Sequence, residues 1–332
     1  GTQGEGISYS VTDKLSIVHT LDDFGIDYIE AGNPASNPKD IEFFHRLKDF
    51  PLRHAKLCAF GSTRRKGVKA QDDSNVQSLL ATDTPAVSIF GKSWDMHVEK
   101  VLRATLDENL DLVYDTIKFM KDAGREVIFD AEHYFDGVLN NEEYALKVLK
   151  AAVEAGADCL ALCDTNGGTL PHIIFDKVQQ VVELFPHVNV GIHCHNDTGC
   201  AVASSIAAVT AGAMQVQGTF TGTGERCGNA DLSIIIPNLQ LKMGYTCVDS
   251  DLSGLSRAVR HVCEVSNMRV YQSKPYVGDS AFAHKGGMHI DGVSKLSSTF
   301  EHVSPESVGN VRRFLMSEVS GRTTVLKKLE KV

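Results

Sequence analysis

The stretch Val188-Asn189-Val190-Gly191-Ile192-His193-Cys194-His195-Asn196-Asp197 is an apolar run that ends in two histidines spaced two residues apart. The Asn-Asp-Thr-Gly that closes the run predicts a strand followed by a loop at its C-terminal end. Because residues two apart on a strand point to the same side, we expect both imidazoles to face one way and Cys194 the other. Two neutral imidazoles aimed at one point form half of a divalent metal site, although a structural role for each histidine remains an alternative.

Short β-rich apolar segments like this one alternate with longer amphipathic segments along most of the chain. Strands are expected at Ile26–Ala31, Ala55–Phe60, Ala86–Phe90, Glu126–Ala131, Cys159–Cys163, Val188–His193 and Met214–Thr219. Helices are expected at Val11–Phe24, Pro38–Leu47, His97–Ala123, Glu142–Ala155, Leu170–Leu184 and Cys200–Ala211. Glycines that suit the left-handed position after a helix follow several of them: Gly25, Gly124, Gly156 and Gly212. Strands that alternate with helices predict βαβ units and a parallel sheet.

Right-handed crossovers wind such a sheet into a barrel or into an open doubly wound sheet. The closed barrel of this class has eight strands, and the pattern supplies one fewer, because Gly1–Ser10 looks like the loop after a strand. We therefore predict an α/β fold of the (β/α)8 TIM-barrel type whose first strand would precede Gly1. Residues 1–275 would form the barrel and residues 276–332 a small α+β linker subdomain, ending in a helical pattern over Thr324–Val332, with no regulatory domain after it.

Composition excludes several classes of function. The 332 residues are 42% hydrophobic and 23% charged, which is ordinary for a globular protein, and the formal charge of −9 disfavours a nucleic-acid surface. No apolar run has membrane-spanning length, and we do not expect Gly1-Thr2-Gln3-Gly4-Glu5-Gly6 to belong to a signal peptide. The eight cysteines lack CxxC spacing and are expected to be reduced packing residues of a cytoplasmic protein.

Polar and glycine-rich residues cluster directly after the expected strands, where barrel enzymes carry their active sites. These clusters are Glu30–Asn33, Gly61–Thr63, Glu132-His133, Asp164–Gly168, His195–Asp197 and Gly222–Arg226. The pattern therefore favours an enzyme over an inert barrel. Asp164, Asp197 and the amide oxygen of Asn229 are candidate metal ligands, and helix capping is the alternative for each.

At this point four motifs together resemble the α-isopropylmalate, homocitrate and citramalate synthases of the DRE-TIM metallolyase superfamily. They are Gly1-Thr2-Gln3-Gly4-Glu5-Gly6, Gly191–Asp197, Gly222–Ala230 and Ala283-His284-Lys285-Gly286-Gly287-Met288-His289. The first motif and Phe60-Gly61-Ser62-Thr63-Arg64-Arg65-Lys66-Gly67 are most similar to the citramalate synthase branch. The resemblance extends over essentially the whole chain.

The resemblance implies a metal-dependent acyltransferase that condenses acetyl-CoA with an α-keto acid, most simply pyruvate to give (R)-citramalate. A divalent ion (Mg²⁺, Mn²⁺ or Zn²⁺) would polarise the keto group while a base takes a proton from the methyl of acetyl-CoA. The resemblance further implies a cytoplasmic homodimer in branched-chain amino acid biosynthesis, acting on small molecules and binding neither nucleic acid nor membrane.

The roles of individual residues follow from the same resemblance. His193 and His195 would bind the metal, with Asn229 as a further or water-mediated ligand. The remaining ligand, an Asp, and a catalytic Arg would stand just before Gly1. Thr165 would grip the keto-acid carboxylate, and Gln3 and Glu30 would line the site. Glu132, set between the apolar Phe129 and Phe135, and His289 would be the catalytic acid and base, with His284 as the alternative to His289.

A basic cluster in the loop after the second expected strand holds Arg64, Arg65, Lys66 and Lys69. Because coenzyme A carries phosphates, Arg64, Arg65 and Lys66 are candidate contacts for it, and a solvated surface is the alternative.

Four other functions remain open. The keto acid could be that of 2-isopropylmalate or homocitrate synthase, because the sequence does not give the pocket volume. An acyl-CoA carbon–carbon lyase uses the same metal chemistry. A metal-dependent amidohydrolase also places two such histidines on a barrel strand, but on its first one. A non-catalytic truncated barrel acting as a dimerisation module is the non-enzymatic alternative.

Overall fold

The computed structural model describes residues 1–249 and 251–315 of the chain. The chain divides into two compact units, Gly1–Leu232 and Ser233–Val332. This division follows from contacts within the chain and not from function. The functional boundary expected between residues 275 and 276 therefore stays a prediction.

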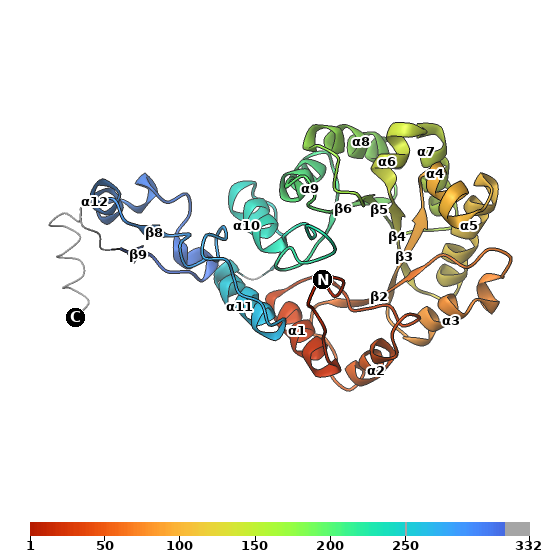
Figure 1. Cartoon of the computed structure of the whole chain (residues 1–332), viewed down its shortest axis with the longest axis horizontal. Helices are drawn as coiled ribbons and strands as arrows, with labels where there is room; N and C mark the ends of the chain where they lie inside the picture. Colours follow the sequence, from red (N-terminus) through yellow and green to blue (C-terminus); the bar gives the residue numbers. More distant parts are fainter. Residues whose placement is uncertain (250, 316–332) are drawn as a thin grey trace. The chain divides into compact units, whose positions relative to one another are not determined.

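The first unit is built on a parallel sheet of seven strands paired in sequence order (Figure 1). The strands are β1 (Tyr28–Glu30), β2 (Lys56–Ser62), β3 (Ala86–Lys92), β4 (Glu126–Glu132), β5 (Cys159–Asp164), β6 (Asn189–Cys194) and β7 (Gln215–Gln217). Each predicted strand overlaps an observed one, and the parallel order confirms the α/β class. The strand expected to precede Gly1 stays a prediction.

Helices surround the outer side of this sheet (Figure 1). They are α1 (Val11–Phe24), α2 (Pro38–Leu47), η1 (Ala70–Asp72), α3 (Ser74–Ala81), α4 (Asp95–His97), η2 (Val98–Leu102), α5 (Leu106–Asp122), α6 (Tyr134–Asn140), α7 (Glu142–Glu154), α8 (Pro171–Leu184) and α9 (Ala201–Thr210). Local chemistry sets their ends: Ser10 and Asp13 form a capping box at the start of α1. The four glycines predicted to follow helices all have positive φ, which confirms that assignment.

One expected helix, His97–Ala123, is wrong as a single element. The chain forms a short α4, then the π-helical turn η2, and leaves the helix at Arg103, whose φ is 56°. Thr105 and Glu108 then make a reciprocal capping box that starts α5 at Leu106. The apolar periodicity runs across this break, and therefore the pattern alone suggested one helix.

Hydrogen bonds between distant strands show that the sheet curls. Tyr28 on β1 bonds the carboxylate of Glu126 on β4, which also accepts from Lys56 at 2.6 Å. Gln217 on β7 donates to Asp130 on β4 at 2.9 Å. Strands three places apart in a flat sheet lie about 14 Å from each other, beyond the reach of such bonds. Both edges therefore fold toward β4, which confirms the predicted barrel-type fold as a curled sheet.

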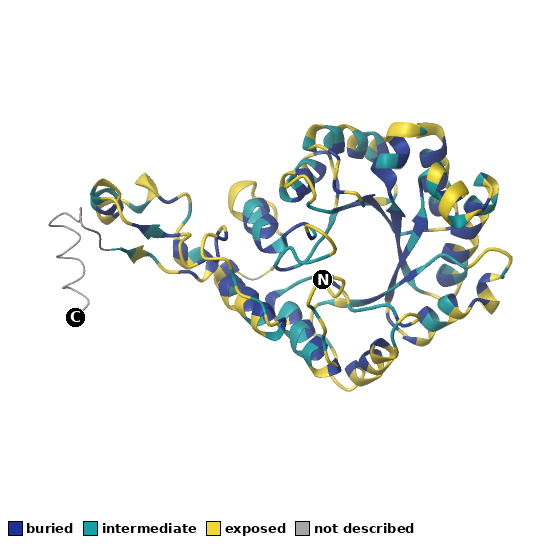
Figure 2. Cartoon of the chain, in the orientation of Figure 1, coloured by how far each residue is buried: buried dark blue, intermediate teal, exposed yellow. Residues whose placement is uncertain are grey.

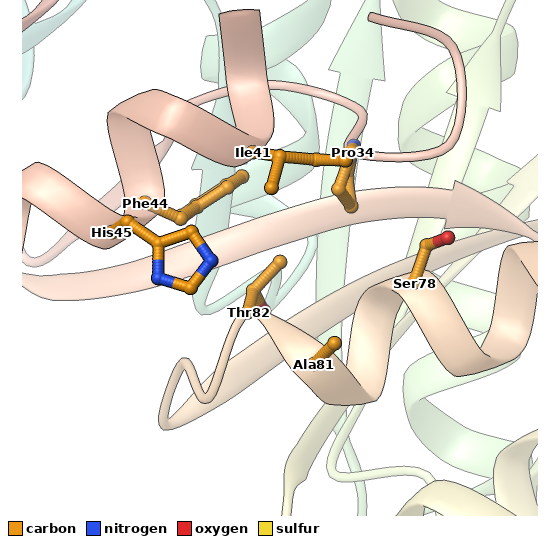
Figure 3. A pocket seen from close by; sticks show the side chains of 7 residues that line it. All are labelled: Pro34, Ile41, Phe44, His45, Ser78, Ala81 and Thr82. Carbon is orange, nitrogen blue, oxygen red and sulfur yellow. The ribbon is translucent and has the colours of Figure 1, made fainter. Parts of the chain in front are cut away.

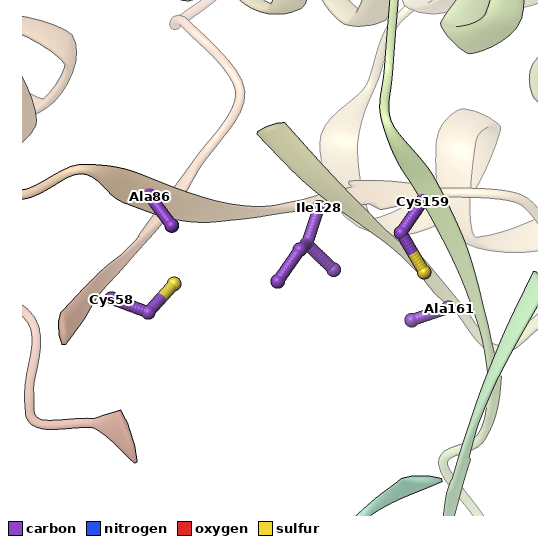
Figure 4. Packing of buried hydrophobic residues seen from close by; sticks show 5 residues of the cluster. All are labelled: Cys58, Ala86, Ile128, Cys159 and Ala161. Atoms are coloured by element: carbon purple, nitrogen blue, oxygen red, sulfur yellow. The ribbon is translucent and has the colours of Figure 1, made fainter. Parts of the chain in front are cut away.

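Alternate residues of the strands build an inner and an outer layer. On the inner face Cys58, Ala86, Ile128, Cys159 and Ala161 form a buried cluster (Figure 4). Tyr28 packs against this cluster. Residues of the opposite face, such as Ile89, Phe129 and Leu162, are fully buried beneath the helices. Figure 2 shows burial concentrated in the strands and on the helix sides that face them. The central strands are therefore buried on both faces.

The second unit combines helices with a two-stranded parallel sheet, which agrees with the predicted α+β character. Its elements are α10 (Leu232–Lys242), η3 (Leu252–Gly254), α11 (Leu255–Val265), β8 (Ala283–His284), α12 (Gly287–Lys295), η4 (Ser297–Thr299), η5 (Pro305–Val308) and β9 (Arg313–Phe314). The helix expected over Thr324–Val332 lies outside the described residues. In the described part of the chain, no helix combines the length and the apolar character needed to span a bilayer.

Candidate active site

The two histidines lie where the sequence predicts them, at the C-terminal end of β6. Their ring centroids are 5.2 Å apart. The segment after β7 folds back along this strand end, where Asn229 forms an antiparallel bridge with His195. The amide of Ala230 donates to the Cys194 carbonyl at 2.9 Å, and that of Asn196 to the Gly228 carbonyl at 2.9 Å. The histidine pair and Asn229 are thus held together by backbone hydrogen bonds.

A hydrogen bond fixes which nitrogen of His193 carries the proton. Its Nδ1 lies 2.9 Å from Oε1 of Gln217, while Nε2 of Gln217 donates to Asp130. Because an amide oxygen only accepts, His193 must donate from Nδ1. Nε2 of His193 is therefore the nitrogen with a free lone pair.

His195 is held as a neutral imidazole, and one of its ring nitrogens has no hydrogen-bond partner among the described residues. The Gly228 carbonyl accepts from the ring, and Nδ1 is buried with no hydrogen-bond partner among the described residues. Burial, followed by the neighbouring His193 and Arg226, lowers the pKa of His195 to about 4. A neutral ring with an unpartnered lone pair is the form that ligates metals.

Imidazole nitrogens with a free lone pair suit a borderline divalent ion. In the described ranges, however, no group of three His, Cys, Asp or Glu side chains is arranged to hold one. Asn229 donates its amide to the Thr223 carbonyl at 2.9 Å, which leaves its Oδ1 open to a further partner. The metal-binding role of His193, His195 and Asn229 therefore stays a prediction.

The two loop aspartates proposed as alternative ligands have other partners. Asp164, at the end of β5, accepts from the amide and hydroxyl of Thr169 and holds the loop after that strand. Asp197 forms a two-point ion pair with Arg226, both bonds being 2.9 Å, and these bonds lower the pKa of Asp197. Arg226 also donates to the Thr165 carbonyl at 2.8 Å, so it joins the loops that follow β5, β6 and β7.

Thr165 and Glu132 lie on neighbouring strand ends. The Thr165 hydroxyl accepts from the amide of His133 at 2.8 Å, which leaves its own proton for a further acceptor. Glu132, the last residue of β4, pairs with Lys92 of β3 at 2.5 Å. Lys92 and Glu132 are direct partners in the strand register, a contact that the sequence analysis did not include.

The N-terminal segment lies beside the ends of β1 and β7. A side chain on Gly1 would meet Thr219 at 3.6 Å, and the Gly1 amino group interacts with the charge of Glu30. Glu30 shares the Ser88 hydroxyl with Asp130, and loss of solvation, then Asp130, raises the pKa of Glu30 to about 8. Solvent still reaches Glu30 at the sheet edge, and Gln3 is exposed.

The two histidines of the C-terminal motif differ in their surroundings within the second unit. His284 is buried and bonds Glu301 at 3.0 Å, and Glu301 is also paired with Arg312. His289 is exposed and stacks on Phe300 at 4.1 Å. His284 is therefore tied into the unit, whereas the ring of His289 is open to solvent; the catalytic role of either stays a prediction.

The basic loop after β2 is largely neutralised by acidic partners. Arg64 pairs with Asp115 at 2.6 Å, and Lys66 pairs with Glu108 at 2.9 Å. Arg65 pairs with the buried Asp73 at 2.9 Å, which also caps α3. A phosphate would have to compete with these carboxylates, and the coenzyme A contact stays a prediction.

The structure adds residues near the site that the sequence analysis missed. Trp94, after β3, stacks on His97 at 5.1 Å and lies 5.8 Å from His133. The inner-face residues Gln217 and Asp130 were also missed, although their side chains point to the same face of the sheet as those of His193 and Glu132. That alternation was the available signal, and it could not show that side chains from distant strands meet.

A small pocket of about 100 Å³ lies elsewhere, between α2 and α3 (Figure 3). Its lining is mostly apolar and consists of Pro34, Ile41, Phe44, His45, Ser78, Ala81 and Thr82. None of the predicted site residues lines it. The histidine pair and its neighbouring loops therefore remain the candidate site.

Comparison with family models matches both parts of the chain. A model described as HMGL-like covers residues 1–262, and one described as homocitrate synthase post-HMGL domain-like covers residues 276–332.

Two curated relatives are similar over 99% of this chain. The (R)-citramalate synthase of Aquifex aeolicus is 53% identical over 331 residues, and the chain spans 63% of its length. The 2-isopropylmalate synthase of Sulfolobus acidocaldarius is 34% identical, and the chain spans 82% of it.

Among solved structures, an HMG-CoA lyase from Bacillus subtilis aligns with a TM-score of 0.67 at 20% identity, covering 81% of this chain and 91% of that one. This last likeness supports the barrel fold alone.

Proposed function

Because the chain belongs to the HMGL-like family, we propose that it condenses acetyl-CoA with pyruvate to form (R)-citramalate. The observation that carries this proposal is the 53% identity to an (R)-citramalate synthase, against 34% to a 2-isopropylmalate synthase, each over 331 aligned residues. Condensation with 2-ketoisovalerate is the second candidate.

In this proposal His193 and His195 hold a divalent cation through their free lone pairs, together with the amide oxygen of Asn229. When bound, such an ion acts as a Lewis acid that polarises the keto group. Its identity among Mg²⁺, Mn²⁺ and Zn²⁺ is part of the proposal to be tested. The aspartate and arginine expected before Gly1 would complete the set.

Polar groups around the pair would bind and orient the substrates. The free proton of the Thr165 hydroxyl suits the carboxylate of the keto acid. Lys92 holds Oε2 of Glu132, which leaves Oε1 for a proton or a substrate contact. We propose Glu132 and His289 as the groups that transfer protons, and a homodimer as the assembly that brings them into use.

Release of coenzyme A from acetyl-CoA, followed with a thiol reagent, tests the proposal. The assay uses the 332-residue chain and a version extended before Gly1 by a strand ending in Arg-Asp, with pyruvate, 2-ketoisovalerate or 2-oxoglutarate. We expect pyruvate to give the fastest release, and chelation with EDTA to abolish it until Mn²⁺ or Mg²⁺ is restored. The proposal fails if both versions release no more coenzyme A with pyruvate than with the other keto acids.

A matched pair of histidine variants separates the metal role from folding. His193→Ala should abolish release and leave the circular dichroism spectrum unchanged, because the ring lies at a strand end. His172→Ala, on the exposed face of α8, should retain full activity. Activity in folded His193→Ala protein would contradict the assigned site.

A further inference from the structure

A chain of hydrogen bonds crosses the inside of the curled sheet and ends at His193. His193 on β6 bonds Gln217 on β7, and Gln217 bonds Asp130 on β4. Asp130 in turn accepts from Ser88 on β3, which is also bonded to Glu30 on β1. Asp130 and Ser88 are 5% and 0% exposed, so solvent does not compete for the centre of this chain.

The direction of each bond follows from the donor groups. Ser88 has one hydroxyl proton and donates it to one carboxylate oxygen of Asp130. Gln217 gives an amide proton to the other carboxylate oxygen of Asp130. Asp130 therefore accepts from two sides, and the Gln217 oxygen is turned toward His193.

This arrangement leaves His193 a single tautomer. If the proton moved to Nε2, the Nδ1 lone pair would face the lone pairs of the Gln217 oxygen. Rotation of the amide would relieve that contact only by turning its oxygen toward the carboxylate of Asp130. The anchored amide thus favours the proton on Nδ1 and keeps Nε2 free of it.

We propose that Gln217 and Asp130 are positioning residues: Gln217 holds His193 as the Nδ1–H tautomer, and Asp130 holds Gln217 in the orientation that does so. The inference rests on the proposed function in one respect, because its consequence is an Nε2 atom kept ready to ligate the metal. Partners that orient a ligating histidine typically contribute about 10-fold to 100-fold in metal affinity.

The first measurement needs neither metal nor activity. Long-range proton–nitrogen NMR of metal-free protein labelled with ¹⁵N-histidine identifies which nitrogen is protonated, with His193→Asn used to assign the signal. We expect wild-type His193 to carry its proton on Nδ1, and the Gln217→Met variant to lose this preference. An Nε2–H tautomer in the wild type overturns the inference, and that result does not depend on how any variant folds.

The second measurement is titration of the same proteins with MnCl2 in a calorimeter. Gln217→Met and Asp130→Asn should each weaken binding by about 10-fold or more. Gln77→Met is the control, because Gln77 is exposed on α3 and bonds only the Gln71 carbonyl; its affinity should stay near that of the wild type. The double variant should bind no more weakly than Gln217→Met, since both residues act through one contact.

The possible outcomes distinguish a failure of this inference from a failure of the proposed function. Wild-type protein that binds Mn²⁺ and makes citramalate, while Gln217→Met binds equally well, overturns the inference alone. Additive losses in the double variant overturn the role of Asp130. Wild-type protein that binds no Mn²⁺, even when extended to Arg-Asp before Gly1, overturns the proposed function, and the tautomer spectrum then still decides whether Gln217 holds His193.

Discussion

Glu30 is a carboxylic acid whose pKa the fold raises toward neutral pH. Poor solvation on the inner face of the sheet and the nearby Asp130 raise its pKa to about 8, from an ordinary value of 4.5. The hydrogen bond with Ser88 opposes this shift, but it is outweighed by the loss of solvation and by the charge of Asp130. The two acidic side chains therefore share one negative charge between them.

This shift makes the stability of the protein depend on pH. Between the unfolded value of 4.5 and the folded value of about 8, the folded state holds a proton that the unfolded chain has released. The contribution of Glu30 to the free energy of unfolding therefore decreases as pH rises through this window. Glu30→Gln has no such dependence, so its stability relative to the wild type should increase from about pH 5 to about pH 8 in urea titrations.

Glu183→Gln, at an exposed position on α8, is the matched control and should show a constant difference. A constant difference for Glu30→Gln as well would contradict the protonated carboxyl.

Sequence alone predicts the histidine pair but not the residues that hold it. Alternation along a strand places His193 and His195 on one side, and the same rule applies to Asp130 and Glu132. The contact between Gln217 and Asp130 joins strands that are three places apart in the sheet, so it depends on curvature. The pairing of Lys92 with Glu132 depends on strand register, which no local pattern determines.

At the scale of elements, the segment Gly222–Asp231 is shaped by glycines that permit close backbone contacts. Gly228 has φ of +91°, and a side chain there would come within 2.0 Å of the Gly222 carbonyl oxygen. The Gly228 carbonyl also receives the amide of Asn196. The position of Asn229 beside His195 thus depends on a residue with no side chain next to it.

Two glycine-to-alanine variants test this dependence. Gly199 also has positive φ, +72°, but a side chain there would have nothing within 4 Å. Gly199→Ala should therefore cost about 1 kcal/mol of stability, from backbone strain alone. Gly228→Ala should cost clearly more, and it should also reduce coenzyme A release because the segment must shift. Equal losses of stability and activity in the two variants, measured by urea unfolding and the thiol assay, would contradict the assigned role of Gly228.

Helix boundaries show a second limit of sequence patterns. Thr105 and Glu108 have the spacing of a capping box, and that signal was present in the sequence. It was outweighed by apolar residues that stay in phase on both sides of Arg103. The short helices α3 and α6 also escaped prediction, because each spans about two turns and offers little periodicity to detect.

At the scale of the whole sheet, stability should vary from its centre to its edges. Strands β3 and β4 each have seven residues and a partner on both sides, whereas β1 and β7 have three residues and one partner each in the described part of the chain. We expect amide hydrogen exchange to be slowest in β3, β4 and β5 and fastest in β1 and β7. Mass spectrometry of peptic fragments measures this order, and equal protection across the sheet would contradict it.

The chain contains a single tryptophan, Trp94, and its position makes it a built-in optical probe. Its indole stacks on His97 and lies beside His133, whose amide is bonded to the Thr165 hydroxyl. Fluorescence excited in the indole band therefore originates beside the loop proposed to grip the keto acid, with no background from another tryptophan. Ligand titrations can be followed by emission from the unlabelled protein, without an engineered dye.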